Sequence, residues 1–179
     1  LKEHLDTLLP VIDKIVNKSI TTGYFPSTLR LAKVSPVLKK PSLDKEVYKN
    51  YRPVSNLPYL GKLIERVVVQ QLKEYRTENN LFEKCQSAYR EFHSTETALL
   101  KITNDLLLAM DTKQCALLVL LDLSAAFDTV NHDILLECLD EDFGLSGTVL
   151  AWMHSYLSDR EQAVVLNGTS SDSQPLTVG

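Results

Sequence analysis

The sequence has no long hydrophobic run and few cysteines. Its longest uninterrupted apolar run, Cys115–Leu121, has seven residues, whereas a membrane-spanning helix needs about 20. The cysteines at positions 85, 115 and 138 are too few and too widely spaced for a disulfide framework or a zinc knuckle, so we expect a reducing compartment. Charges occur throughout residues 1–20, which argues against a secretory signal peptide there.

Basic side chains are scarce in the C-terminal part of the chain. Residues 111–179 contain two basic and 11 acidic side chains, whereas residues 1–110 contain 17 basic and 12 acidic ones. Seven of the basic residues lie in the window 30–52. This asymmetry has two explanations that the charges alone leave open. The basic window is either a solvated loop, or a phosphate-binding wall that faces an acidic pocket for metal ions.

The size and composition are those of one ordinary globular domain. The chain has 179 residues, of which 44% are hydrophobic and 23% charged. These values exclude a wholly disordered chain, a collagen-like chain and a coiled coil. Because the chain begins with leucine rather than methionine, we expect it to be a piece of a longer protein.

Apolar residues recur at helical spacing in five segments. The first spans residues 5–20; Pro10 predicts a kink or a late start, and Gly23 should end the helix. A second helix is expected over residues 59–79. A third follows Ser94, a favourable N-cap residue, and should turn inward its apolar residues Leu99, Leu100, Ile102, Leu106, Leu107 and Met110. Two shorter helices are expected over residues 132–139 and 148–157, and His132 should accompany the start of the first of these.

Other segments have the properties of strands. Residues 32–38 should form an edge strand because Pro36 interrupts them, and residues 51–57 should pair back on them as a hairpin. The run Cys115–Leu121 should be a strand buried on both faces. Residues 162–166 and 170–178 flank Asn-Gly, the strongest short hairpin signal. With a short helix over residues 124–130, the fold class is α+β.

Asp122 ends the apolar run, where loss of water would oppose its charge. A bound Mg²⁺ would offset that cost, or Asp122 could simply cap the short helix that follows. Haloacid-dehalogenase-type phosphohydrolases place an Asp-x-Asp motif after such a strand, but Ser124 stands at the second position here. Receiver domains need an early acidic pair on a strand, which residues 1–30 do not offer.

Four sequence blocks resemble the reverse transcriptases of non-LTR (LINE-type, jockey-like) retrotransposons, in that family's order. Residues 121–132 (LDLSAAFDTVNH) resemble the first palm motif, and residues 50–57 (NYRPVSNL) resemble a fingers motif. Residues 61–66 (GKLIER) resemble the helix after it. Residues 86–90 (QSAYR) with 93–99 (HSTETAL) resemble the next fingers block. The resemblance extends to residues 23–26 (GYFP) and to the C-terminal end.

The resemblance implies an α+β right-hand polymerase fold with the fingers and the N-terminal part of the palm only. Residues 1–179 would be a partial reverse transcriptase domain, with the N-terminal helix and fingers in about 1–112 and the first half of the palm in about 113–179. The family's Asp-Asp turn should follow later, and no Asp-Asp pair occurs in this sequence. We therefore expect this chain to be inactive by itself.

The resemblance also implies roles for individual residues. Asp122 would be the catalytic carboxylate and a metal ligand, and the backbone carbonyl of Leu123 a second contact of a two-Mg²⁺ site. Phe127 would stack under the incoming sugar and exclude a ribose 2′-OH; plain core packing is the alternative for that ring. Asp128 should brace the following segment rather than bind metal.

Cationic residues of the fingers would bind the substrate. Arg52, Lys40 and Lys39 would hold the triphosphate, with Arg52 as the best match to the family motif. Arg90 would either touch template phosphates or only brace the hairpin. The implied partners are an RNA template, a DNA primer or target and deoxynucleoside triphosphates, with no membrane. The implied location is intracellular, in the cytoplasm and nucleus.

Two other hypotheses stay open on the sequence. The chain could be a decayed or co-opted nucleic-acid-binding or interaction module without catalysis, because such a module would inherit the same motifs. An unrelated phosphohydrolase built on Asp122 would instead hydrolyse a phosphate ester with this chain alone.

Overall fold

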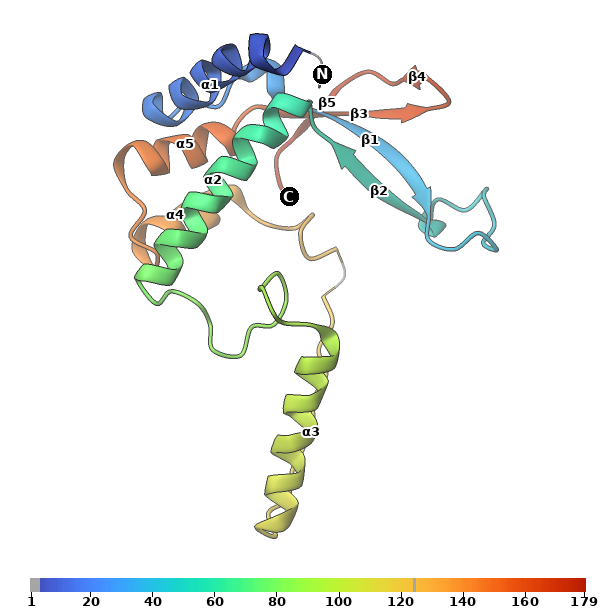
Figure 1. The fold of residues 1–179 in the computed structure, drawn as a ribbon. Coiled ribbons are helices and arrows are strands. Elements are labelled where there is room, and N and C mark those ends of the chain that lie inside the picture. Colours follow the sequence, from blue (N-terminus) through green and yellow to red (C-terminus); the bar gives the residue numbers. More distant parts are fainter. Residues whose placement is uncertain (1–3, 124) are drawn as a thin grey trace. The chain divides into compact units, whose positions relative to one another are not determined.

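The structure is a computed structural model that describes residues 4–123 and 125–179. The chain divides into two compact units (Figure 1). Residues 1–73 and 125–179 form one unit, which we call the sheet unit, and residues 74–124 form the other, the α3 unit. Each unit is described by itself.

The sheet unit contains one five-stranded sheet. Its strands are β1 (Leu31–Leu38), β2 (Tyr51–Asn56), β3 (Arg160–Leu166), β4 (Thr169–Ser170) and β5 (Gln174–Leu176). Strand β1 pairs antiparallel with β2, as the predicted hairpin, and parallel with β3. Strand β3 pairs antiparallel with both β4 and β5. Sequentially distant strands β1 and β3 therefore form the middle of the sheet.

The prediction that β1 is an edge strand is wrong, because β1 lies between β2 and β3. Its register explains how an internal strand accommodates Pro36. The parallel pairing with β3 covers only residues 31–34, so it stops before the proline. On the other side Pro36 lies opposite Pro53 of β2. The missing proline N–H therefore costs no bond to β3.

The predicted Asn-Gly hairpin is confirmed between β3 and β4. Asn167 and Gly168 have φ values of 51° and 83°, and both residue types tolerate that left-handed conformation. The second strand is shorter than expected, since β4 and β5 are separate strands within the predicted range 170–178.

Four α-helices belong wholly or mainly to the sheet unit: α1 (Leu5–Thr22), α2 (Tyr59–Glu78), α4 (His132–Glu141) and α5 (Gly147–Leu157), with short 3-10 helices η2 (Ser27–Leu29) and η3 (Tyr48–Asn50). The four predicted helices are confirmed. Helix α1 ends at Gly23 as expected, but it begins at Leu5, so the alternative of a late start at Pro10 is wrong. None of the helices in the described ranges is long and apolar enough to cross a membrane.

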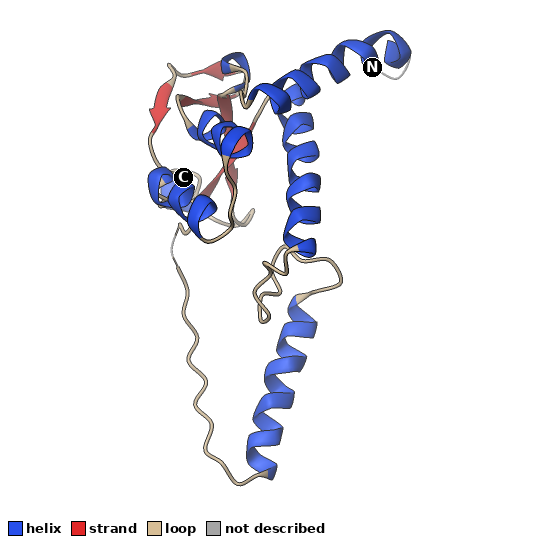
Figure 2. Cartoon of the chain, turned by 90° about the vertical axis from the view of Figure 1, so that its left-hand side faces the viewer, coloured by secondary structure: helices blue, strands red, loops and turns tan. Residues whose placement is uncertain are grey.

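The core of the sheet unit lies where α1, α2 and α5 meet, beside the sheet (Figures 1 and 2). Its buried members are Val16, Phe25, Ile64 and Trp152. Phe25 meets Trp152 edge-on, with ring centroids 5.7 Å apart, and Trp152 stacks on Tyr156 at 5.2 Å. The Trp152 indole N–H donates to the Ser19 hydroxyl at 3.0 Å. Aromatic packing with a satisfied polar edge thus joins segments from both ends of the chain.

Arg30 is a buried polar junction of the same unit, with 6% of its surface exposed. One guanidinium nitrogen donates to the Phe25 carbonyl at 3.1 Å and to the Ser155 hydroxyl at 3.0 Å. The other terminal nitrogen donates to the Asp159 carboxylate at 3.1 Å. These bonds offset the cost of burying the charge.

Tyr156 connects α5 to α2. Its hydroxyl donates to the Glu65 carboxylate at 2.5 Å, and its carbonyl accepts a bond of 2.9 Å from Arg160. Burial, followed by the bond to Glu65, raises the pKa of Tyr156 to about 12, because both favour the protonated phenol.

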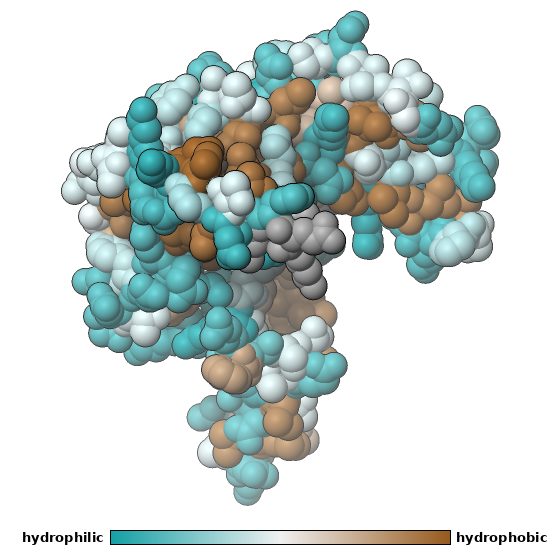
Figure 3. Space-filling view, turned by 45° about the horizontal axis from the view of Figure 1, so that its top comes forward, coloured by the Kyte–Doolittle hydropathy of each residue, from teal (hydrophilic) through white to brown (hydrophobic). Residues whose placement is uncertain are grey.

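The α3 unit contains α3 (Thr95–Asp111), which begins at the predicted N-cap. The Ser94 hydroxyl accepts from the Thr97 N–H at 3.2 Å, and the Thr97 hydroxyl accepts from the Ser94 N–H at 2.9 Å. The expectation that α3 turns an apolar face inward is wrong: Leu100 is 70% exposed, and no described residue of the unit is buried. Brown surface accordingly appears in Figure 3 on the part of the chain that contains α3 and the tract after it.

The predicted strand Cys115–Leu121 is also wrong. This segment has no regular secondary structure (Figure 2). It is also exposed throughout. A strand needs hydrogen-bonded neighbours, and no strand among the described residues pairs with this one. The short helix predicted over residues 124–130 is instead a turn over residues 125–129. Ser124, the expected start of that helix, lies outside the described residues.

Candidate nucleotide-binding site

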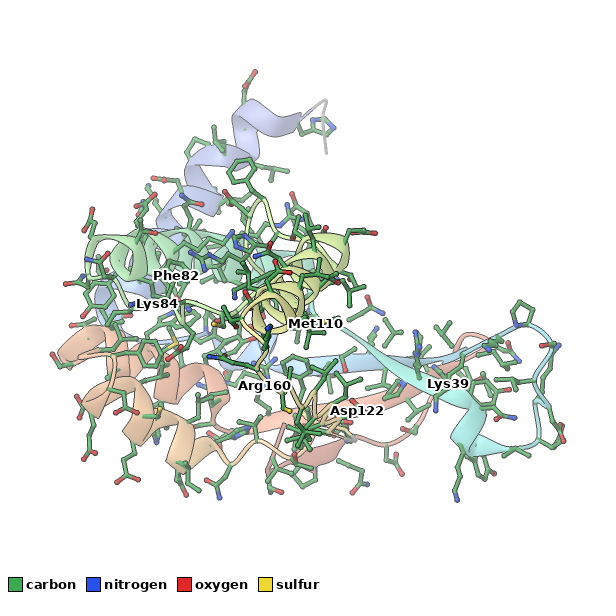
Figure 4. All side chains as sticks on the ribbon, turned by 90° about the horizontal axis from the view of Figure 1, so that it is seen from below. Lys39, Phe82, Lys84, Met110, Asp122 and Arg160 are labelled. Atoms are coloured by element: carbon green, nitrogen blue, oxygen red, sulfur yellow. The ribbon has the colours of Figure 1, made fainter. Side chains whose placement is uncertain are left out.

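Three of the predicted site residues lie on or next to the β1–β2 hairpin. Arg52 is exposed on β2, opposite Val37 of β1. Lys39 directly follows β1 (Figure 4), where its backbone N–H donates to the Asn50 carbonyl at 2.8 Å and its ammonium donates to the Lys49 carbonyl at 2.7 Å. Lys40 is the next residue and is exposed. The hairpin therefore places three cations at the end where β1 and β2 are joined.

The loop that joins β1 to β2 is held by its own polar contacts. The Asn50 amide donates to the Asp44 carbonyl at 2.8 Å, and the Tyr51 hydroxyl donates to the Lys45 carbonyl at 3.0 Å. The Asp44 carboxylate accepts from the Glu46 N–H at 2.9 Å. These bonds fix the loop, so its exposed lysine side chains project from a defined backbone.

Phe127 lies in the turn over residues 125–129 of the same unit. The Asp128 N–H donates to the Ala125 carbonyl at 3.0 Å, and Ala125 has a φ of 53°. Phe127 as a whole residue is 68% exposed, which excludes a fully buried core role for it. An exposed aromatic ring on a fixed turn is available to contact a flat or apolar part of a ligand.

Asp122 and Leu123 are exposed residues of the α3 unit, in the extended tract after α3 (Figure 4). The prediction that Asp122 ends a central strand is wrong. No cluster of three or more His, Cys, Asp or Glu side chains suited to a metal occurs within the described ranges. Asp122 and Phe127 belong to different units. The family resemblance implies that both residues serve one active site, and this stays a prediction.

Arg90 lies in the loop before α3, also in the α3 unit. Its guanidinium is 5.4 Å from the centre of the Phe82 ring, and one of its nitrogens donates to the Glu83 carbonyl at 3.4 Å. The Arg76 guanidinium lies 4.2 Å from the centre of the same Phe82 ring, which is labelled in Figure 4. The arginine thus has bracing contacts, while its role toward template phosphates stays a prediction.

Sequence reasoning missed two polar arrangements in the sheet unit. The sequence marks Arg30 only as one basic residue of the window 30–52, yet its side chain is buried. His132 was expected only to accompany a helix start. It is the first residue of α4, and its ring also contacts the Gly179 carbonyl at 3.0 Å. Most of these partners lie far away in the sequence: Ser155 and Asp159 are 125 and 129 residues from Arg30, and Gly179 is 47 residues from His132. Such distant contacts leave no local signal in the sequence.

Comparison with known proteins identifies the family of this chain. Residues 37–178 match the sequence pattern of the family described as "Reverse transcriptase (RNA-dependent DNA polymerase)". The chain belongs to the reverse transcriptase family. The matched range includes the hairpin from Val37 onward, α3, the tract with Asp122 and the turn with Phe127.

Two fruit-fly proteins are similar to this reverse transcriptase chain over nearly its whole length. The probable RNA-directed DNA polymerase from transposon BS of Drosophila melanogaster is 30% identical over 92% of the chain. The RNA-directed DNA polymerase from mobile element jockey of the same species is 30% identical over 97%. The matches cover 18% and 19% of these proteins, so the chain spans about a fifth of their length. The reverse transcriptase assigned here is thus of the jockey-like, non-LTR type.

Proposed function

We propose that this chain forms the fingers and the N-terminal part of the palm of a right-hand RNA-directed DNA polymerase from a non-LTR retrotransposon. The family match over residues 37–178 carries the proposal. On this assignment residues 1–112 contain the N-terminal helix and fingers, and residues 113–179 the first half of the palm. The whole enzyme would add deoxynucleotides to a primer 3′ end while it copies an RNA template.

The β1–β2 hairpin would hold the triphosphate of the incoming nucleotide. Arg52 supports this role because its exposed planar fork can bind two phosphate oxygens at once. Lys40 would add a point charge. Lys39 directs one N–H to the Lys49 carbonyl, which leaves its remaining ammonium protons for phosphate.

Phe127 would lie under the sugar of the same nucleotide and exclude a ribose 2′-OH. Its exposure on a hydrogen-bonded turn supports this, because a steric barrier needs a ring that is both accessible and fixed.

Asp122 and the Leu123 carbonyl would hold Mg²⁺. Both supply oxygen ligands, which this ion prefers, and the exposure of both residues leaves them accessible. When bound, the metal would supply charge stabilisation for phosphoryl transfer. One carboxylate does not suffice for two ions, so we propose that residues 1–179 bind metal weakly and do not polymerise nucleotides alone.

The partners of the whole enzyme would be an RNA template, a DNA primer or target, and deoxynucleoside triphosphates. Arg90 would approach the template, in addition to its contact with Phe82. Because template and target must meet, we propose an intracellular location that includes the cytoplasm and the nucleus.

A non-catalytic role is the second candidate: a nucleic-acid-binding module that retains the fold of a polymerase. The exposed cations Arg52, Lys39 and Lys40 of the hairpin would serve such a module equally well. Primer extension distinguishes the polymerase from the binding module. A binding module would bind nucleic acid, but a longer protein that contains it would add no nucleotide.

The decisive variant is Asp122→Asn in a full-length reverse transcriptase that contains residues 1–179. The assay is primer extension on an RNA template with Mg²⁺. Because asparagine retains the shape but removes the ligand charge, we expect nucleotide addition to fall by about 100-fold or more, with template binding nearly unchanged. Asp128→Asn, six residues away in the turn, is the matched control and should keep most of the activity. Parent-level activity of Asp122→Asn would overturn the assignment of every site residue placed relative to it.

Arg52→Ala tests the hairpin separately. Loss of a charged phosphate contact should raise the KM for deoxynucleotides by about 10-fold, with a smaller effect on template affinity. Lys33→Ala removes a cation from the neighbouring strand β1 and serves as the control. An unchanged KM for Arg52→Ala would exclude the triphosphate role.

A further inference from the structure

Gly179 is held at both its amide and its carbonyl by the segment that follows Phe127. Its N–H donates to the Val130 carbonyl at 3.1 Å. Its carbonyl lies 3.0 Å from Nε2 of His132, and because a carbonyl only accepts, this ring nitrogen donates. The chain that leaves β5 is thus hydrogen-bonded at two points to the start of α4.

The direction of the His132 side chain is set by a capped helix start. The Asn131 side-chain oxygen accepts from the Asp133 N–H at 2.9 Å and from the Ile134 N–H at 3.1 Å. These bonds hold the first turn of α4. His132 is half-buried there. The ring therefore meets Gly179 from a fixed backbone.

Residue 179 lies directly against the turn that carries Phe127. A Cβ atom at this position would be 3.3 Å from the Asp128 Cα atom and 3.4 Å from the Phe127 carbonyl oxygen. Its φ of 104° is also one that favours glycine. Close approach and backbone conformation thus give two independent reasons for a glycine here.

The two-point contact completes a hydrogen-bonded connection from this turn to the strand of Arg52. Strand β5, which precedes Gly179, pairs with β3, and β3 pairs with β1. Strand β1 pairs with β2, where Val37 lies opposite Arg52. The whole connection lies within the sheet unit.

We propose that His132 and Gly179 form a clamp that positions Phe127 relative to Arg52, and so sets the choice between deoxynucleotides and ribonucleotides. This rests on the proposed function, in which Phe127 meets the sugar and Arg52 the triphosphate of one nucleotide. Both clamp residues act through Phe127 and are positioning residues. A steric barrier against one hydroxyl group requires the ring to be held within about 0.5 Å, which a loose turn does not provide.

The test uses His132→Ala in a full-length reverse transcriptase that contains residues 1–179. The ratio of kcat/KM for a deoxynucleotide to that for the matching ribonucleotide should fall by about 2- to 10-fold, the effect of one lost hydrogen bond. His132→Gln retains a side-chain N–H donor and should recover most of the ratio. His154→Ala removes an exposed histidine of α5 and should leave the ratio unchanged.

Gly179→Ala is a second variant that leaves His132 in place. It should lower the same ratio, because the added methyl group pushes against the backbone of Phe127 and Asp128. Amide hydrogen exchange gives a readout without nucleotide: the Gly179 N–H should exchange faster in His132→Ala than in the parent. The melting temperature of each variant checks its folding; where His132→Ala fails to fold, His132→Gln and Gly179→Ala decide.

Phe127→Ala separates the clamp from the proposed function. If this variant loses discrimination while folded His132→Ala and Gly179→Ala retain it, the clamp is wrong and the role of Phe127 stands. If Phe127→Ala itself retains discrimination, the sugar-contacting role is wrong and the positioning role falls with it. Loss of discrimination in Phe127→Ala, His132→Ala and Gly179→Ala, with recovery in His132→Gln, supports both the clamp and the sugar-contacting role of Phe127.

Discussion

The sheet unit and the α3 unit contain similar kinds of apolar residues but differ completely in burial. Among the residues that the structure describes, the buried hydrophobic ones all belong to the sheet unit: Val16, Phe25, Ala32, Val34, Ile64, Leu145, Trp152 and Ala163. In the α3 unit, Leu100 is 70% and Leu121 is 89% exposed. Apolar content therefore does not by itself produce a core; a core needs apolar faces from several elements that can close on one another.

The two units differ in how many segments they bring together. The sheet unit combines residues 1–73 with residues 125–179, so helices and strands from both ends of the chain share its core. The α3 unit is one continuous segment, with α3 as its main element. A single amphipathic helix has no second apolar surface to pack against, and its order depends on local bonds such as the Ser94 cap.

The largest contrast should appear on removal of one apolar side chain from each unit. Trp152→Ala removes the ring that packs on Phe25 and Tyr156, and should lower the free energy of unfolding by about 3–5 kcal/mol. Leu108→Ala, at a position 55% exposed on α3, should change it by less than about 0.5 kcal/mol. Denaturant unfolding monitored by circular dichroism measures both. Equal effects would mean that the α3 unit has a core of its own.

An alkaline pH series should sharpen the comparison, because Tyr156 has its pKa raised to about 12 in the sheet unit. Between about pH 10 and pH 12 the unfolded chain loses this proton while the folded one keeps it. The free energy of unfolding should then fall with rising pH by up to about 1.4 kcal/mol per pH unit from this group. Below about pH 10 the contribution of Tyr156 to the free energy of unfolding is constant, because the phenol is protonated in both the folded and the unfolded chain.

The matched control for the pH series is Tyr156→Phe. It removes the titrating phenol but keeps the ring, so the fall between pH 10 and pH 12 should shrink by the contribution of this group. Thermal melting curves at pH 9 and pH 11.5 measure the difference. The same pH dependence in both proteins would contradict a protonated, buried Tyr156.

The smallest expected effect concerns helix caps. Ser94→Ala removes the side-chain acceptor for the Thr97 N–H and should cost about 1 kcal/mol of local helix stability in the α3 unit. Ser146 occupies the N-cap position of α5, but its side chain makes no capping bond. Ser146→Ala should therefore cost less. Amide hydrogen exchange in the first turns of α3 and α5 measures the loss of local helix stability in the two variants. A larger loss in α5 than in α3 would contradict the capping role of Ser94.

Elements with a local signal could be predicted from the sequence. Gly23 ends α1, Ser94 caps α3, and Asn167-Gly168 forms a hairpin turn, because each of these residues acts within four positions of itself. The β1–β2 hairpin was predicted on similar grounds. The hairpin places Arg52, Lys39 and Lys40 at one exposed end. That part of the candidate site could therefore be predicted from the sequence.

Elements that depend on distant partners could not be predicted in the same way. Pro36 indicated an edge strand, but the register with β3 ends before it. The run Cys115–Leu121 has the composition of a buried strand, yet a strand forms only with neighbours, and composition does not supply them. The position of Asp122 at a strand end is predicted from that run, whereas its catalytic role comes from the family resemblance. Its placement is therefore the part of the site that the sequence supports least.

The hydrogen bond between Trp152 and Ser19 joins residues 133 positions apart. Chains are synthesised at about 5–20 residues per second, so α1 would leave the ribosome roughly 7–27 s before α5 can complete the core. During that interval the apolar faces of α1 and α2 are unpaired and open to chaperones or to other nascent chains. A slowly closing core of this kind makes the early part of synthesis, rather than the finished fold, the stage most exposed to aggregation.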